Sequence, residues 1–175
     1  MKKINLIAMM KKKDDFFGAF IEGDQFKDYS GTSLVFWSLE NTSLDSRYCI
    51  SNFLLDKGVN VKCVGEANES VLHVLLGQVK HDIEKTVMLC ERFINKGVDI
   101  NLLDSNQRVA FQWILNMKYT DEQLKPLYDL WFSQPYVELT IPNAWGYSPI
   151  DLARKLPFRK DILGRMEAYV QQKEN

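Results

Sequence analysis

The sequence predicts an all-α protein in which about four helix-pair repeats, with a period of about 39 residues, stack between capping helices at both ends. A turn that leads into a capped helix start is clearest at residues 143–153, and weaker copies occur upstream. A helix end that contains glycine, at residues 54–61, returns in phase with it at residues 93–100. The chain has 175 residues, 46% of them hydrophobic, so we expect one domain with a continuous core.

The clearest helix start has the chemistry of a tight turn followed by a cap. Gly146 tolerates the backbone angles of the turn, Ser148 is a favoured N-cap residue, and Pro149 fits the first helical position. Weaker copies of this start begin at Thr32, Ser70 and Arg108. The intervals between the four starts are therefore nearly equal, which defines the period of the repeat.

The helix-end pattern repeats with the same period as the helix starts. Gly97 follows Gly58 by one period, and a fainter third copy lies at Tyr136, one further period along the chain. Two markers that repeat in phase indicate a repeat array.

These markers resemble those of the ankyrin-repeat family. Residues 148–150 (Ser-Pro-Ile) and 70–73 (Ser-Val-Leu-His) are similar to the Thr-Pro-Leu-His that opens the family's first helix. Residues 57–61 and 96–101 are similar to the Lys-Gly-Ala-Asp-Val-Asn that ends its second helix. The resemblance covers about residues 14–172 and implies an ankyrin-type solenoid. It is poor in the third repeat, where arginine and tyrosine replace the family's threonine and glycine.

The period departs from the family's, which is about 33 residues. The link between a helix end and the next start has nearly constant length, so the extra residues are expected inside the pairs, as longer helices and longer turns. Trp37 and Trp113 are expected to fill the wider gap between repeats. The single domain, 1–175, divides into an N-terminal cap (1–27), three repeats (28–65, 66–103 and 104–142) and a C-terminal capping repeat (143–175).

The N-terminal elements follow from apolar spacing. Residues 3–22 are expected to form one or two capping helices, because apolar side chains recur at helical intervals while lysines stay outside. The first pair is expected at residues 32–40 and 45–57. Gly58 then ends its second helix in a left-handed conformation.

The later pairs follow the same scheme. They are expected at residues 70–79 with 82–96, 108–117 with 121–132, and 148–156 with 158–172. Pro135 and Pro157 prevent the preceding helices from continuing. The basic residues of the last pair, Arg159 among them, are expected on a solvated capping face.

The sequence contains no recognisable catalytic or metal-binding motif. His73 fills the family's histidine position, and the resemblance implies that its ring binds neighbouring turns. Its counterparts, Phe111 and Asp151, are chemically unlike histidine, so no repeated chemistry is expected there. The two histidines and three cysteines lack a metal-site or redox spacing, and no phosphate-binding loop is visible. We therefore expect no cofactor and no enzymatic activity, with an unrecognised catalytic site as the alternative.

The charge pattern bears on partners and location. Residues 1–13 carry a net charge of +5 and residues 14–69 a net charge of −6. An acidic first half disfavours nucleic acid as a partner and suits a cationic protein, although a solvated acidic face is the more common explanation. The short apolar N-terminal stretch lacks a cleavage site, and no segment is long enough to span a membrane. With cysteines suited to a reducing environment, we expect a cytoplasmic protein.

A stacked array presents its hairpin tips and first helices as one continuous concave surface. The residues expected to bind a partner protein there are Asp28, Tyr29, Glu66, Asn68, Glu69, Asp104, Asn106, Gln107, Asn143, Trp145 and Tyr147. Exposed aromatic side chains dominate many interfaces, which favours Trp145, Tyr147 and Tyr29. The alternative for Trp145 is that it packs beneath the cap of its own chain.

The functional expectation is protein binding, by a monomer when unbound. A small, divergent ankyrin-type chain resembles the immunity proteins that bacteria make against toxins, which block a partner's active site. The partner would then be a toxin or another enzyme. A scaffold or effector with an unrelated cellular partner is the alternative.

Overall fold

A computed structural model describes residues 3–174, which form ten α-helices, one short 3-10 helix and no strands. The helices are α1 (Ile4–Met10), α2 (Lys13–Ala19), η1 (Asp24–Phe26), α3 (Leu34–Leu39), α4 (Leu44–Asp56), α5 (Val71–Leu76), α6 (Ile83–Asn95), α7 (Phe111–Asn116), α8 (Asp121–Phe132), α9 (Pro149–Lys155) and α10 (Lys160–Glu174). The prediction of an all-α fold is confirmed. None of the described helices is long and apolar enough to cross a lipid bilayer.

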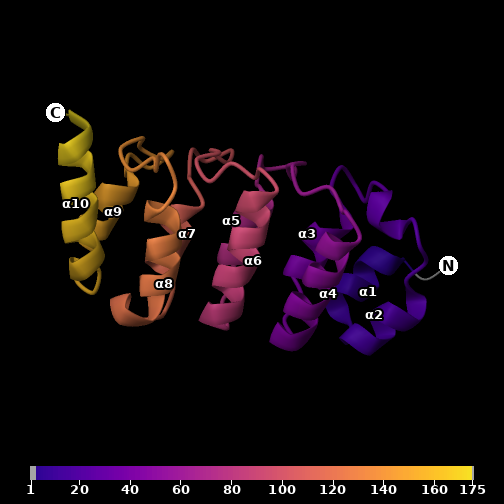
Figure 1. The fold of residues 1–175 in the computed structure, drawn as a ribbon. Coiled ribbons are helices and arrows are strands. Elements are labelled where there is room, and N and C mark those ends of the chain that lie inside the picture. The colour runs from indigo at the N-terminus through magenta and orange to yellow at the C-terminus, as the bar shows by residue number, and fades with distance from the viewer. Residues whose placement is uncertain (1–2, 175) are drawn as a thin grey trace.

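The helices lie side by side in a row that runs from α1 and α2 at one end to α10 at the other (Figure 1). Each short helix, α3, α5, α7 and α9, pairs with the longer helix that follows it, and the long loops between pairs lie along one edge. The short helices contact one another along the row, as do the longer helices α4, α6, α8 and α10. The row therefore has two helical layers.

The longer helices begin and end where local chemistry predicts. The side chains of Ser43, Asp82 and Thr120 each accept a hydrogen bond from the backbone N–H three residues later and so cap α4, α6 and α8. Gly58 and Gly97 follow α4 and α6 with φ of 76° and 84°, a conformation that glycine adopts most readily. The predicted bounds of α8 are correct, and those of α4 and α6 are within one residue.

The short helices differ from their prediction. Each has six or seven residues, whereas the helix patterns suggested nine or ten. The added length of these repeats therefore does not lie in the first helix of each pair. Trp37 and Trp113 are half-buried and pack against the core.

A continuous apolar core lies between the layers and along the whole row. Trp131 is its largest fully buried side chain. Cys90 is fully buried, and desolvation raises the pKa of its thiol. Cys49 is only half-buried, so the prediction of a buried cysteine is correct for Cys90 alone.

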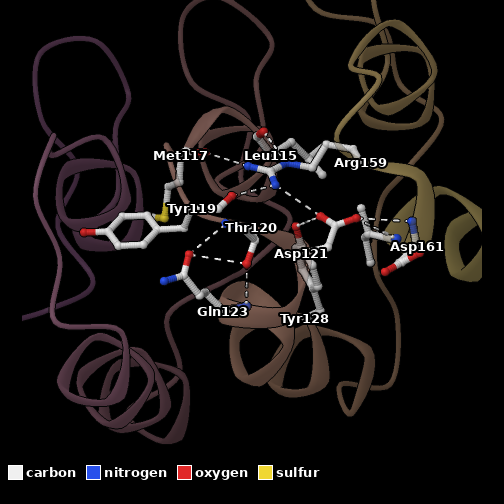
Figure 2. A network of polar contacts seen from close by, with 10 residues as sticks. Leu115, Met117, Tyr119, Thr120, Asp121, Gln123, Tyr128, Arg159 and Asp161 are labelled. Carbon is white, nitrogen blue, oxygen red and sulfur yellow. Dashed lines mark hydrogen bonds and ion pairs between the residues drawn. The ribbon is translucent and has the colours of Figure 1, made fainter.

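The expectation that Arg159 lies on a solvated face is wrong, because its side chain is fully buried. Its guanidinium donates to three carbonyl oxygens at the end of α7 and in the turn that follows, at 2.6–2.9 Å, namely those of Leu115, Met117 and Tyr119. It also lies 3.1 Å from the Asp121 carboxylate. Figure 2 shows Arg159 reaching from the last pair into this turn. One side chain thus satisfies carbonyl groups that helix ends leave without partners.

A second buried arginine has the same role near the other end of the row. Arg47 is 2% exposed and donates to the carbonyl oxygens of Asn41, at 2.9 Å, and of Lys80, at 2.7 Å. It therefore joins the turn after α3 to the turn after α5. Neither arginine lies in a recognisable motif.

Candidate protein-binding face

Three loops at the edge of the row share one geometry. In residues 65–69, 104–108 and 143–147, the first N–H donates to the fifth carbonyl oxygen at 2.8, 2.9 and 3.0 Å. The fourth residue of each loop has a positive φ: Asn68, 56°; Gln107, 59°; Gly146, 81°. These positions follow one another at a constant interval of one period, which makes the three tips structural equivalents.

Neighbouring tips are joined through their backbones. Ser105 N–H donates to the carbonyl oxygen of Ala67 at 2.7 Å, and Ala144 N–H donates to that of Asn106 at 2.8 Å. Side-chain bonds add to this link, since the Asn68 amide donates to the carbonyl oxygen of Leu103 at 2.7 Å. The tips therefore form one connected edge.

The tip geometry corrects the predicted alignment of the third repeat. Arg108 closes its tip, in the same position as Glu69 and Tyr147, so it is not the counterpart of the capping Ser70. That counterpart is Val109, which has no hydroxyl group. The start of α7 accordingly has no side-chain cap, and the sequence marker was displaced by one residue.

Two predicted contact residues shape the tips instead. The Asp104 carboxylate accepts from the N–H groups of Asn106 and Arg108 at 2.9 and 2.8 Å. Asn143 Oδ1 accepts from the N–H groups of Trp145 and Tyr147 at 2.9 and 3.2 Å. Asp104 is only 1% exposed, so its prediction as a partner contact is wrong. Asn143 is half-buried.

The remaining predicted contacts differ in accessibility. Asp28, Glu66, Asn68 and Gln107 are exposed, whereas Glu69, Asn106 and Tyr29 are half-buried. Tyr29 lies in a tighter first tip, where its hydroxyl group donates to the carbonyl oxygen of Asp24 at 2.9 Å. Desolvation, with a smaller effect of the Asp24 charge, raises its pKa to about 12. Tyr29 is therefore tied to the N-terminal cap.

The role of Asp104 leads to a prediction about stability. Asp104→Ala is expected to lower the free energy of unfolding by about 2–3 kcal/mol, because two backbone N–H groups and Arg108 lose a charged acceptor. Asp104→Asn should cost less than the alanine change, since Asn143 makes the same backbone bonds in the next tip, but the new amide nitrogen would face the Arg108 guanidinium and the ion pair would be lost. Urea denaturation would measure both values, and equal losses would contradict this role.

His73 and its structural counterparts bind the turns around them. His73 Nδ1 accepts from the Ser70 N–H at 3.2 Å, which leaves the proton on Nε2 for the Arg108 carbonyl oxygen at 2.9 Å. Desolvation lowers the His73 pKa and so favours this neutral ring. The predicted structural role of His73 is correct.

The expectation that this position carries no repeated chemistry is wrong. Gln112, one period after His73, donates to the Tyr147 carbonyl oxygen at 3.0 Å and so repeats its bond to the next tip. Asp151, one further period along the chain, accepts from Ser148 and completes the same capping box as His73 does with Ser70.

An apolar row runs beneath the tips on the short helices. Its members occupy equivalent positions in α3, α5, α7 and α9, and all are half-buried against the core: Trp37, Val74, Trp113 and Leu152. A cleft of about 200 Å³ lies between α5 and α7, where Trp113, Val79 and Lys118 line it. Val79 is 79% exposed. We call the tips together with the exposed sides of these four helices the short-helix face.

A stack of rings and cations connects the tips to this row. The Arg108 guanidinium lies 4.4 Å from the ring centroid of Trp113 in α7 and 5.7 Å from that of Trp145 in the next tip. Lys155 in α9 lies 3.6 Å from the ring centroid of Tyr147. Trp145 is 60% exposed, so the alternative that it packs beneath its own cap is wrong. Tyr147 is also exposed.

The described residues contain no group of three or more histidine, cysteine, aspartate or glutamate side chains arranged to hold a metal ion. Both histidines are buried, and desolvation lowers the pKa of His81 as it does that of His73. The exposed chemistry of the short-helix face is aromatic, aliphatic and charged, which suits contact with another macromolecule.

The chain matches no protein-family model and no curated protein. Among solved structures, it is similar to one described as a functionally unknown protein from Leptotrichia buccalis C-1013-b. The two chains have 28% sequence identity and a TM-score of 0.86, and the match covers 99% of this chain and 95% of that chain. The two proteins therefore share a fold over nearly their full lengths.

Proposed function

We propose that this chain is a non-catalytic, protein-binding module of the ankyrin-repeat type. In this proposal the short-helix face corresponds to the concave surface on which such arrays bind their partners. The constant spacing of the tips supports the repeat assignment. The bonds from His73 and Gln112 to the following tips support it as well, because the ankyrin resemblance implied such a role for the histidine.

The observation that carries the proposal is the exposure of Trp145 within an ordered stack. A tryptophan buries a large area at small entropic cost when a partner covers it. Its neighbour Arg108 is held by Asp104, so less freedom is lost on binding than for an unrestrained arginine. Tryptophan, tyrosine and arginine are also the residues most enriched among interface hot spots.

Affinity capture from lysate and secreted fractions of the source cells would test the proposal. The wild-type chain should retain a stoichiometric partner, and the Trp145→Ala/Tyr147→Ala variant should bind it about tenfold or more weakly. Both side chains are exposed, so this variant should keep its fold. Met88→Ala is the matched control, because it removes an apolar side chain that is 60% exposed from α6 in the other layer.

The outcomes separate the possible roles. Equal capture by the double variant, or loss of capture by Met88→Ala alone, would move the site away from the short-helix face. A toxin-like enzyme whose activity is blocked by the captured chain would extend the proposal to an immunity role. A partner without such activity would favour a scaffold or effector role.

A further inference from the structure

The charges on the short-helix face are separated along the row. Acidic residues belong to its first two repeats, namely Asp28, Glu40, Glu66 and Glu69. Desolvation, followed by the charge of Glu69, raises the pKa of Glu40, which agrees with two carboxylates lying near each other. The N-terminal part of the face is therefore anionic.

The later repeats present cations among aromatic rings. Lys118 lines the same cleft as Trp113, and Lys155 lies over Tyr147. The acids nearby are already paired, since Asp104 binds Arg108 and Asp151 binds Arg154. Lys118 and Lys155 form no ion pair among residues 3–174 and therefore add positive charge beside the stack. The acidic character of the chain's first half thus does not extend to the aromatic end of the face.

One guanidinium nitrogen of Arg108 is available to donate a hydrogen bond to a partner. Its Nε and Nη2 both bind the buried Asp104 Oδ2, at 2.7 and 2.6 Å, while Nη1 has no acceptor among residues 3–174. The side chain is 21% exposed, and the guanidinium lies against the ring of Trp113 and near that of Trp145. An immobilised guanidinium with a free N–H group is suited to a carboxylate oxygen, because such charge-assisted bonds are short and strong.

We propose that the partner contacts the Arg108 stack with a carboxylate, carried by an extended acidic segment whose apolar residues lie along the row of Trp113 and Leu152. This inference rests on the proposed function and specifies the chemistry that the short-helix face selects. A cationic partner side chain is disfavoured at this end by Lys118 and Lys155, and it would find its acidic counterparts only in the first two repeats.

A random 12-residue peptide library displayed on phage, selected on the full-length chain, would test this inference. Selected peptides should be enriched in aspartate or glutamate, and an Asp→Asn or Glu→Gln change in a selected peptide should weaken binding about tenfold or more. The protein variant is Asp104→Asn/Arg108→Tyr, which gives the third tip the residues that Asn143 and Tyr147 contribute to the fourth. It should therefore fold and lose most of the preference for acidic peptides.

A double-mutant cycle then assigns the contact. On the variant, replacing the carboxylate by an amide should weaken binding much less than on the wild-type chain, because only Lys118 and Lys155 remain to favour the charge. Lys85→Gln in α6 removes an exposed positive charge from the other layer and should change nothing. Selected peptides without acidic enrichment, no enriched peptide at all, or a full carboxylate effect on the tip variant would overturn the inference.

The same peptides distinguish failure of the acidic-segment inference from failure of the proposed function. Peptides that need Trp145 and Tyr147 but no carboxylate would refute only the acidic-segment inference. Peptides that bind the Trp145→Ala/Tyr147→Ala variant normally and lose binding to Met88→Ala would refute the short-helix face itself.

Discussion

Arg159→Met is expected to lower the free energy of unfolding by about 3–5 kcal/mol, because it leaves buried polar groups without their partner. The guanidinium satisfies the carbonyl oxygens of Leu115, Met117 and Tyr119 and also pairs with Asp121. Methionine can fill much of the volume but donates no hydrogen bond. Asp121 also accepts from the backbone N–H groups of Asp161 and Ile162, so the loss should loosen the start of α10 (Figure 2).

Arg165→Met is the matched control on the same helix. Arg165 pairs with Asp129 at 2.6 Å, but both side chains are more than a third exposed, so its loss should cost less than about 1 kcal/mol. Urea denaturation of both variants, with hydrogen exchange of α9 and α10, would measure the effects. An Arg159→Met protein as stable as Arg165→Met would show that the buried network contributes little.

Trp131→Ala is expected to cost a similar amount, about 3–5 kcal/mol, because it opens a large cavity in the core. Trp131 is fully buried in α8, and its ring centroid lies 6.3 Å from that of Phe111 in α7. Each pair in the row contacts mainly its neighbours, and α8 contacts α6 on one side and α10 on the other, so the loss should be greatest in α6 to α10. Hydrogen exchange would locate it, and calorimetry or urea denaturation would give its size.

Trp131→Phe separates packing from hydrogen bonding. The buried Trp131 Nε1 has no acceptor among the described residues, so phenylalanine removes an unsatisfied donor together with part of the volume. We expect it to cost less than half as much as alanine. Equal costs for the two variants would indicate that Nε1 contributes an interaction that the packing argument omits.

The helices could be predicted from sequence where the signal is local. Gly58 and Gly97 end helices because their left-handed backbone favours glycine, and the Thr120 cap sets the start of α8. The third repeat is aligned incorrectly from sequence because Val109 occupies the position of the capping serine and has no hydroxyl group. The tip turn that reveals the register depends on the φ of Gln107, which no single residue type dictates.

The site was predictable only in part, because some of its features depend on tertiary contacts rather than on local sequence. Trp145 and Tyr147 could be identified as exposed aromatics, because a tip between helix pairs has little core to enter. The burial of Asp104 and Arg159 could not be predicted from sequence. Each side chain is buried among partners that tertiary structure brings together, and no local motif indicates them. The sequence around Arg108 resembles a weak helix start, and only its position four residues after Asp104 indicates the ion pair that the two side chains form.

The links between neighbouring tips have a consequence for engineering new specificities. The hydrogen bonds from Ser105 to Ala67 and from Ala144 to Asn106 join main-chain atoms only, so they do not depend on which side chains these positions carry. A library that randomises the middle tip positions, while keeping the residues of positive φ, should therefore preserve the alignment of the loops. Many different surfaces could be displayed on one unchanged set of helices.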